Sequence, residues 1–297
     1  MKLRILPYIA LSLIASGCGN SNTDSGITVT VSIPPQQRLV ESIAGDKVKI
    51  NCLMTADANP ESFEPAMNSM IDLRKSDIYF PMGTLDFERA LTDRIGNDGP
   101  EIINMSEGVN YLYGTHDHHH HDGDEHDGHE HHEAPDPHVW SSLRNMRLMA
   151  KNVADALCKL DGNNAEYYKS NLDKLSSRID SLDAVTEAAL DTVKVRKFIV
   201  WHPSLSYFAN DYGLKQITVG SHGKELSVKE LAERIREATD TDSQCVFFFQ
   251  KEFDSHSAAE INRQFGAKIV IINPMNPDWE SEIMNLTDAL RNYNTAD

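Results

Sequence analysis

The first half of the chain alternates short apolar runs with amphipathic stretches. The β-branched segment ITVTVSI at 27–33 predicts a strand that ends at Pro34-Pro35. A helix is expected from Gln36 to Ala44. The next expected elements are a strand at 48–54 (VKINCLM), a helix at 67–75 and a strand at 77–83 (DIYFPMG). This alternation of strands and helices favours a parallel α/β sheet.

Two helical patterns occupy the middle of the chain, over 142–160 and over 166–193. The apolar stripe of the second is Leu172, Leu175, Ile179, Leu182, Val185 and Ala189. A helix of this length would span roughly 40 Å, the width of a small domain. We therefore expect it to join two lobes. A coiled-coil dimer arm is the alternative, but the stripe is short and ends weakly at Ala189.

The second half repeats the alternation without a near-identical internal repeat, so the two halves are similar only in pattern. The expected elements are strands at 197–201, 216–220, 245–249 and 268–272, and helices at 204–212, 227–239, 257–265 and 278–293. The 297 residues suit two domains of ordinary size. The fold class is therefore α/β, with two lobes built on parallel sheets and joined by a long rigid helix.

The start of the chain indicates export. Residues 1–17 combine Lys2 and Arg4 with an apolar stretch and small residues, which is typical of a signal peptide. The small residues before Cys18 resemble a bacterial lipobox, so we expect Cys18 to be lipidated and to anchor the protein to a membrane. The alternative is an ordinary cleaved signal with an incidental cysteine. Residues 18–26 form a polar tether, followed by lobes at 27–163 and 193–297 and the linker helix at 164–192.

The charge balance of the chain favours a cationic ligand. The chain has 28 Lys and Arg residues against 45 Asp and Glu residues, a formal net charge of -17. This charge argues against nucleic acid and against docking on anionic lipid through basic patches. Between His116 and Asp136 there are eight carboxylates and no Lys or Arg.

A His-rich segment supplies a first set of metal ligands. Imidazole is a good ligand for Zn²⁺, Cu²⁺ and Ni²⁺, and nearby carboxylates raise the local cation concentration. We interpret this segment, 116–132, as a solvated loop that collects metal weakly; a plain low-complexity spacer is the alternative. Its nine histidines are His116, His118, His119, His120, His121, His126, His129, His131 and His132.

Two isolated histidines stand where a strand or helix meets a loop. His138 lies in DPHVW, and His202 lies in VWHPS directly after an expected strand. Parallel α/β sheets bind ligands at the carboxyl ends of their strands, so these two positions are candidate ligands.

Several longer segments stand in one order along the chain: VSIPPQQRLVESIAGDKVKI, NPESFEP, DLRKSDIYFPMG, DPHVWSSLRNMRLMAKNVADAL, FIVWHPSLSYFANDYGL and FGAKIVIINP. Together they resemble the metal-binding lipoproteins of ABC importers for zinc and manganese, from Ile27 to the C-terminus. The resemblance implies one metal ion in the cleft between two lobes, and delivery to an ABC permease and its ATPase. It implies a monomeric, extracytoplasmic protein of the cell envelope, on the periplasmic side. A His-rich loop before the DPH motif resembles the zinc branch.

The resemblance also implies the ligand set. It carries the family's histidines over to His138 and His202, and its third histidine falls at Glu61, where this chain departs from the zinc branch. A carboxylate is still a good Zn²⁺ ligand. The family's aspartate near the last strand corresponds to Asn273, a second departure. The fourth position is thus assigned to Asn273, water or a nearby carboxylate such as Asp278.

The mixed nitrogen and oxygen ligands favour Zn²⁺ over Mn²⁺, although Glu61 moves the set toward the manganese type. We therefore expect a solute-binding protein for Zn²⁺ and no enzyme. The alternatives are a manganese-type binding protein, a metal buffer that acts through the loop alone, and a secreted zinc hydrolase. The hydrolase has little support because the chain contains no HExxH motif.

Overall fold

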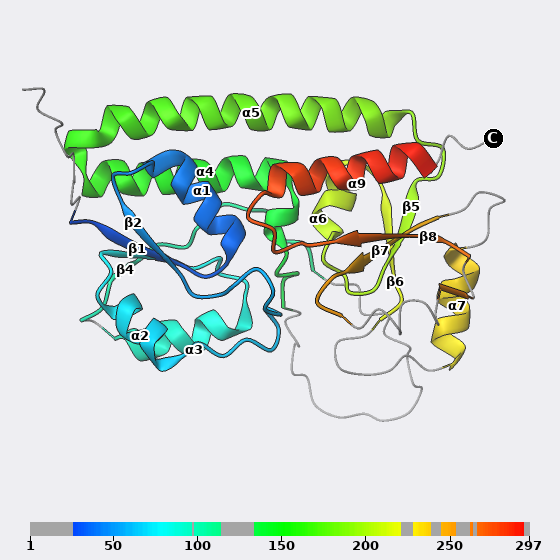
Figure 1. Cartoon of the computed structure of the whole chain (residues 1–297), viewed down its shortest axis with the longest axis horizontal. Helices are drawn as coiled ribbons and strands as arrows, with labels where there is room; N and C mark the ends of the chain where they lie inside the picture. Colours follow the sequence, from blue (N-terminus) through cyan, green and yellow to red (C-terminus); the bar gives the residue numbers. More distant parts are fainter. Residues whose placement is uncertain are drawn as a thin grey trace, which may run out of the picture.

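Two four-stranded parallel sheets form the centres of two lobes in the computed structural model (Figure 1). The structure describes residues 26–96, 98–113, 134–220, 228–238, 245–253, 262–263 and 266–293. The first sheet has the order β2-β1-β3-β4 and the second the order β6-β5-β7-β8, so the two lobes share one topology. The strands are β1 (Thr28–Val31), β2 (Lys49–Cys52), β3 (Ile78–Phe80), β4 (Glu101–Ile102), β5 (Lys197–Val200), β6 (Lys215–Thr218), β7 (Val246–Gln250) and β8 (Lys268–Ile272).

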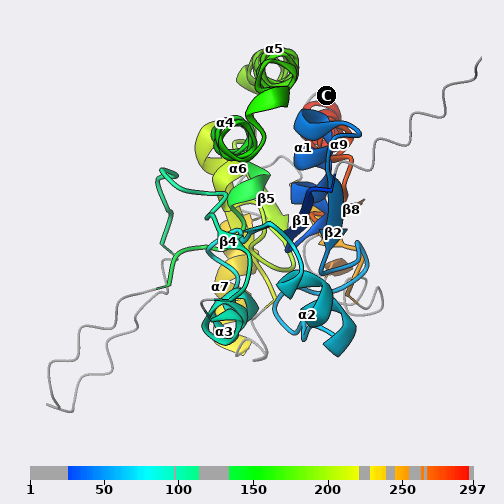
Figure 2. The ribbon, with the colours of Figure 1, turned by 90° about the vertical axis from the view of Figure 1, so that its left-hand side faces the viewer.

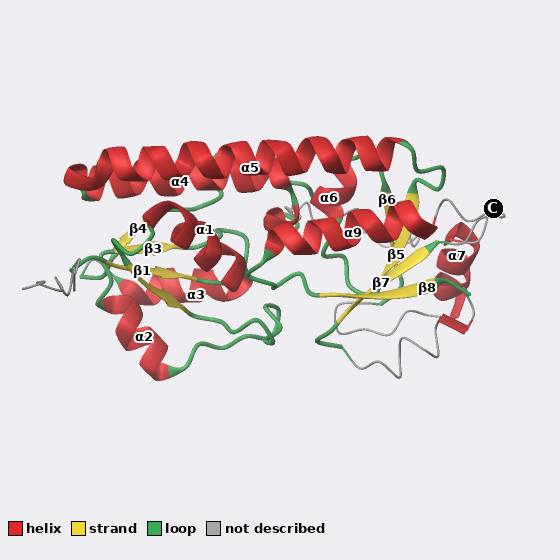
Figure 3. Cartoon of the chain, turned by 45° about the horizontal axis from the view of Figure 1, so that its top comes forward, coloured by secondary structure: helices red, strands yellow, loops and turns green. Residues whose placement is uncertain are grey.

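Helices cover the two sheets and connect the lobes. In Figure 2, α4 and α5 lie at the top of the molecule, and α2, α3 and α7 lie at the opposite side of the sheets. Figure 3 shows α5 running along both lobes. The helices are α1 (Pro34–Ala44), α2 (Met67–Arg74), α3 (Asp86–Ile95), α4 (Leu143–Leu160), α5 (Ala165–Asp191), α6 (Ser206–Asp211), α7 (Val228–Ala238) and α9 (Trp279–Tyr293), with a 3₁₀ turn η1 at Val139–Ser141. None of them is long and apolar enough to span a membrane.

The predicted α/β architecture with a long connecting helix is confirmed, and α5 has 27 residues. The exact start of α1 differs from the prediction: the helix begins at Pro34, not Gln36. Proline suits the first turn of a helix, where its missing N–H has no partner to lose. Gln36 helps to start the helix because its Oε1 accepts hydrogen bonds from the backbone N–H groups of Ser32 and Ile33, both at 3.0 Å.

The buried stripe of α5 also differs from the prediction. Val185, expected on the apolar face, is 54% exposed, whereas Thr186 is buried. The other buried positions of this helix are Tyr168, Leu175, Ile179 and Leu190. The buried side of α5 changes along the helix because α5 packs against α1 and α4 in one lobe and against α9 in the other.

Two elements of the structure were not indicated by the sequence pattern, and one predicted helix falls outside the described residues. Helix α3 and the short strand β4 were not predicted. The helix predicted at 257–265 falls almost wholly outside the described residues.

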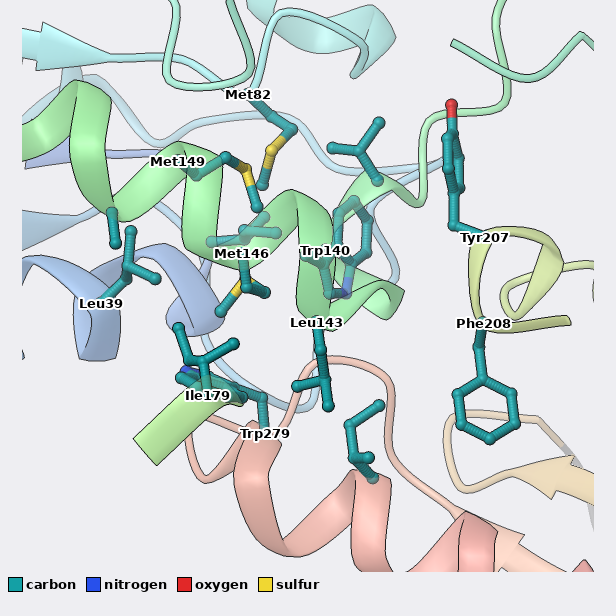
Figure 4. Close-up of a cluster of buried hydrophobic side chains, with 14 of the residues drawn as sticks. Leu39, Met82, Trp140, Leu143, Met146, Met149, Ile179, Tyr207, Phe208 and Trp279 are labelled. Carbon is teal, nitrogen blue, oxygen red and sulfur yellow. The ribbon is translucent and has the colours of Figure 1, made fainter. Parts of the chain in front are cut away.

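One continuous apolar core joins the two lobes. It contains side chains of β1 and α1 from the first lobe, of α4 and α5, and of β5, α6 and α9 from the second lobe. Figure 4 shows its central part, with Leu39, Met82, Trp140, Leu143, Met146, Met149, Ile179, Tyr207, Phe208 and Trp279 labelled. Because interiors are close-packed, a core shared in this way resists large changes in the relative position of the lobes.

A buried carboxylate organises the end of β3. Glu88 is only 2% exposed and accepts hydrogen bonds from the backbone N–H groups of Met82 and Gly83, both at 2.7 Å, and from the hydroxyl of Ser32. Burial raises the pKa of Glu88 to about 6, and the hydrogen bonds act in the opposite direction. At neutral pH the group is therefore ionised and serves only as an acceptor.

Replacing Glu88 by Gln should destabilise the fold although the side chain keeps its shape. The new NH₂ group faces at least one backbone N–H that then has no acceptor, so we expect a loss of about 1–3 kcal/mol in the free energy of unfolding. Urea denaturation at pH 7 measures this. The exposed Asp93→Asn variant on the same helix should change the value by less than about 0.5 kcal/mol. Equal stabilities of the two variants would contradict the role given to Glu88.

Candidate metal centre

Glu61 lies in the loop between β2 and α2, at the edge of the sheet where β1 and β3 also end. Its backbone N–H donates to Oδ1 of Asn59 at 2.9 Å, which closes a local turn. The next aromatic residue, Phe63, packs edge-on against Phe87 of α3, with ring centroids 5.0 Å apart. The Glu61 side chain is 34% exposed, so it lies between solvent and the buried histidines.

His138 is buried just before the turn η1. Its Nδ1 lies 2.9 Å from Oδ1 of Asp136, and the same oxygen accepts from the backbone N–H of His138 at 2.9 Å. Burial alone would raise the pKa of Asp136, but the hydrogen bonds and the charge of His138 outweigh it and lower that pKa. Asp136 is therefore ionised at neutral pH and holds the imidazole in one orientation.

His202 follows β5 by two residues and is also buried. The side-chain amide of Gln250, the last residue of β7, holds its backbone on both sides. Oε1 of Gln250 accepts from the N–H of His202 at 3.3 Å, and Nε2 donates to the carbonyl of His202 at 2.6 Å. The position of this histidine thus depends on the neighbouring strand in the sheet.

These three side chains meet although they are far apart in the sequence. Nε2 of His138 and Nε2 of His202 are 3.1 Å apart, and Nε2 of His202 is 3.4 Å from Oε1 of Glu61. Two ligand atoms on one tetrahedral Zn²⁺ lie roughly 3.3–3.5 Å apart, given metal–ligand distances of about 2.0–2.2 Å. Both separations are close to this range. However, no group of three such side chains in the described part of the chain is already placed to hold an ion, so the side chains must shift to enclose one.

The hydrogen bonds also assign the protons of the two rings. Because a carboxylate only accepts, Nδ1 of His138 donates to Asp136, so the lone pair of this ring lies on Nε2 when the ring is neutral. His202 is then the donor in the contact between the rings. A metal ion can bind the lone pair of His138 directly, whereas binding to Nε2 of His202 requires that ring to carry its proton on Nδ1 instead.

The residues considered for the fourth position are engaged within their own loop. Oδ1 of Asn273 accepts from the backbone N–H of Met275 at 3.1 Å, and its own N–H donates to Glu282 at 2.9 Å. The carboxylate of Asp278 accepts from the hydroxyl of Ser281 at 2.7 Å at the start of α9. Their part in a ligand set stays a prediction.

Two residues near the site were missed in the sequence. Asp136 precedes His138 by two positions in an Asp-x-His pattern typical of an oriented imidazole. Glu252 follows the carboxyl end of β7, and His202 is a candidate ligand because it follows the carboxyl end of β5 in the same way. Burial raises the pKa of Glu252, and the charges of His138 and Glu61 both act on it. Cys18 and the histidines of 116–132 lie outside the described residues.

Two parallel α/β lobes, a long connecting helix and a histidine–carboxylate group between loops of both lobes define a solute-binding protein for a metal ion. The comparison with known families agrees. A model of the family described as zinc-uptake complex component A, periplasmic, matches residues 29–295, and the chain belongs to this family.

Individual relatives are similar over most of the chain. The high-affinity zinc uptake system protein ZnuA of Bacillus subtilis is 27% identical over 281 residues, covering 90% of this chain and 86% of the relative. The manganese ABC transporter substrate-binding lipoprotein PsaA of Streptococcus pneumoniae is 25% identical over 253 residues, covering 79% and 77%. The crystal structure of a zinc-bound ZnuA deletion mutant superposes with a TM-score of 0.80 at 29% identity, covering 91% of this chain and 99% of that chain.

Replacing Asp136 by Asn should weaken zinc binding. Asn no longer requires a proton on Nδ1 of His138, so the ring populates orientations and tautomers that do not present Nε2. We expect the affinity to fall about 10–100-fold, the usual effect of losing such a partner. Competition with a chromophoric chelator measures the affinity. The exposed Asp180→Asn variant makes the same charge change away from the site and should bind as the wild type does; equal affinities for both variants would refute the role of Asp136.

Proposed function

We propose that this chain captures Zn²⁺ between its two lobes through Glu61, His138 and His202 and delivers it to an ABC permease driven by an ATPase. The observation that carries the proposal is the pair of separations among the three side chains, 3.1 Å and 3.4 Å, which come from loops of different lobes. Membership of the zinc-uptake family supports the same function. Since this family supplies binding components of transporters, the protein is not an enzyme and the hydrolase alternative falls away.

Zinc is the favoured metal because two imidazoles and a carboxylate form a mixed set that suits a borderline-soft ion. Mn²⁺ prefers more oxygen ligands and remains the alternative, in line with the similarity to the manganese lipoprotein PsaA. The ligand set, including Asn273 as a fourth member, belongs to this proposal.

The capture step uses small movements. Side chains of the site must shift to enclose an ion, while the core shared by both lobes holds the loops in place. Further ties cross between the lobes next to the site: Trp140 donates to the carbonyl of Pro274 at 2.9 Å, and Tyr207 donates to the carbonyl of Asp136 at 2.9 Å. Loading thus closes the ligands around the metal without a wide hinge motion.

The proposal includes the location of the protein. Residues 1–17 serve as a signal peptide, and lipidated Cys18 with the tether up to residue 26 anchors a monomer at the periplasmic side of the cell envelope. The lobe boundaries at 27–163 and 193–297, with the linker at 164–192, are part of it. Support comes from the charged and apolar pattern before Cys18 and from the relatives named as lipoproteins.

Replacing His202 by Ala should abolish the tight site. The loss of a ligand exceeds the loss of a supporting partner, so we expect zinc affinity to fall by more than about 100-fold. Metal analysis of protein purified without added metal and chelator competition both report this. The matched control is Asn210→Ala on the exposed side of α6, which should keep one zinc ion per chain. An unchanged affinity in the His202 variant would exclude this histidine as a ligand.

The His-rich segment 116–132 is proposed as an accessory collector of metal. Deleting it should remove weak additional zinc equivalents and leave one tight site, because the ligands of the site lie elsewhere in the chain. Zinc titration followed by calorimetry separates the two classes of binding. If the deletion removes nearly all binding while the protein stays folded, the chain is a metal buffer and the importer function is wrong.

A further inference from the structure

The turn after β7 places a second carboxylate beside the histidines. β7 pairs with β5 in parallel register, with Val200 opposite Phe248, so the carboxyl ends of the two strands lie side by side. His202 follows β5, and Lys251, Glu252 and Phe253 follow β7. Side chains at adjacent strand ends of a parallel sheet face one crevice.

Two residues of this turn, Gln250 before Glu252 and Phe253 after it, contact His202. Before it, the amide of Gln250 holds the backbone of His202, with bonds of 3.3 Å and 2.6 Å, and also donates to the hydroxyl of Ser204 at 2.9 Å. After it, the ring of Phe253 lies 6.1 Å from the ring of His202, measured between centroids. Glu252 is thus held in the turn between two contacts with a candidate ligand.

The same turn is tied to the loop that carries Glu61. Nζ of Lys251 lies 2.7 Å from Oδ1 of Asp57, four residues before Glu61. This ion pair connects the second lobe to the first across the site. The half-buried carboxyl of Glu252 is close enough to feel the charges of both His138 and Glu61.

The charge of the site calls for a second carboxylate. A Zn²⁺ ion bound by one carboxylate and two neutral imidazoles keeps a net charge of +1 among its direct ligands, and the ionised Asp136 offsets this charge only through the ring of His138. A net charge in a buried site is unfavourable unless a partner neutralises it. Asn273 has no charge and uses its amide oxygen in its own loop, and Asp278 bonds to Ser281.

We infer that Glu252 is the second carboxylate ligand of the metal, completing a set of two nitrogens and two oxygens with Glu61, His138 and His202. This inference rests on the proposed function and deepens it. The ion then neutralises two carboxylates from opposite lobes, which repel each other without it. Metal binding therefore draws the turn after β7 and the loop of Glu61 together.

The test compares the variants Glu252→Gln and Glu252→Asp with the wild type in the full chain. Chelator competition for Zn²⁺ gives the affinity of the tightest site, and the visible spectrum of bound Co²⁺ reports its coordination. Glu187→Gln, exposed on α5, makes the same charge change away from the site. Circular dichroism and the urea midpoint without metal verify that every variant is folded.

We expect Glu252→Gln to bind Zn²⁺ at least about 10-fold more weakly. Losing a ligand should reduce the affinity at least as much as losing a residue that only hydrogen-bonds a ligand. Its Co²⁺ spectrum should change, Glu252→Asp should retain more affinity, and the Glu187 variant should match the wild type. Weaker binding with an unchanged Co²⁺ spectrum would overturn the inference, since Glu252 would then act only through its charge.

The failures of the two proposals are distinguishable. Wild-type affinity and spectrum in the Glu252→Gln variant refute this inference alone and leave the proposed function intact. A wild-type chain that binds no Zn²⁺ tightly refutes the proposed function, and the inference with it.

Discussion

The apolar core that passes from one lobe to the other is the constraint on which the site depends. Side chains of α1, α4, α5, α6 and α9 pack in a single cluster, so the two sheets are held at a fixed separation (Figure 4). His138 and His202 belong to opposite sides of this arrangement, yet their Nε2 atoms lie 3.1 Å apart. Placing two ligands to within a few tenths of an ångström requires supports that do not move, and close packing provides them. A freely hinged pair of domains would not hold this distance.

Each proposed ligand is held by a different interaction. The ionised carboxylate of Asp136 accepts a hydrogen bond from His138 and orients its ring. The side-chain amide of Gln250 holds the backbone of His202. Glu61, whose side chain is 34% exposed, is the most exposed of the three. The carboxylate is therefore open to solvent while both imidazoles are buried. The ion pair of Lys251 and Asp57 is exposed, so it contributes little to stability, but it joins the loop of Glu61 to the turn after β7.

The proposed ligand set mixes the nitrogen ligands that suit zinc with the oxygen ligands that suit manganese, although the family is that of zinc uptake. In the proposed set, Glu61 stands where the family resemblance implies an imidazole, and the uncharged Asn273 stands where it implies an aspartate. The proposal for Glu252 restores that charge from a different strand of the same sheet. A site can tolerate such an exchange because neighbouring strand ends in a parallel sheet open onto one crevice, so a ligand lost from one can be supplied by another.

The amino-acid sequence by itself determined the class of fold, because strands and helices have different hydrophobic periods that survive in the primary pattern. It also singled out His138 and His202 as residues at the ends of elements. The beginning of α1, the rotation of the stripe on α5 toward Thr186, and the short strand β4 depended on packing partners that no local pattern contains. Asp136 lies two residues before His138 in the sequence, and its Asp-x-His pattern could have marked it. Only the tertiary structure set Glu252 near the histidines, because distance in space between residues of separate loops is a property of the packed sheets and not of sequence spacing.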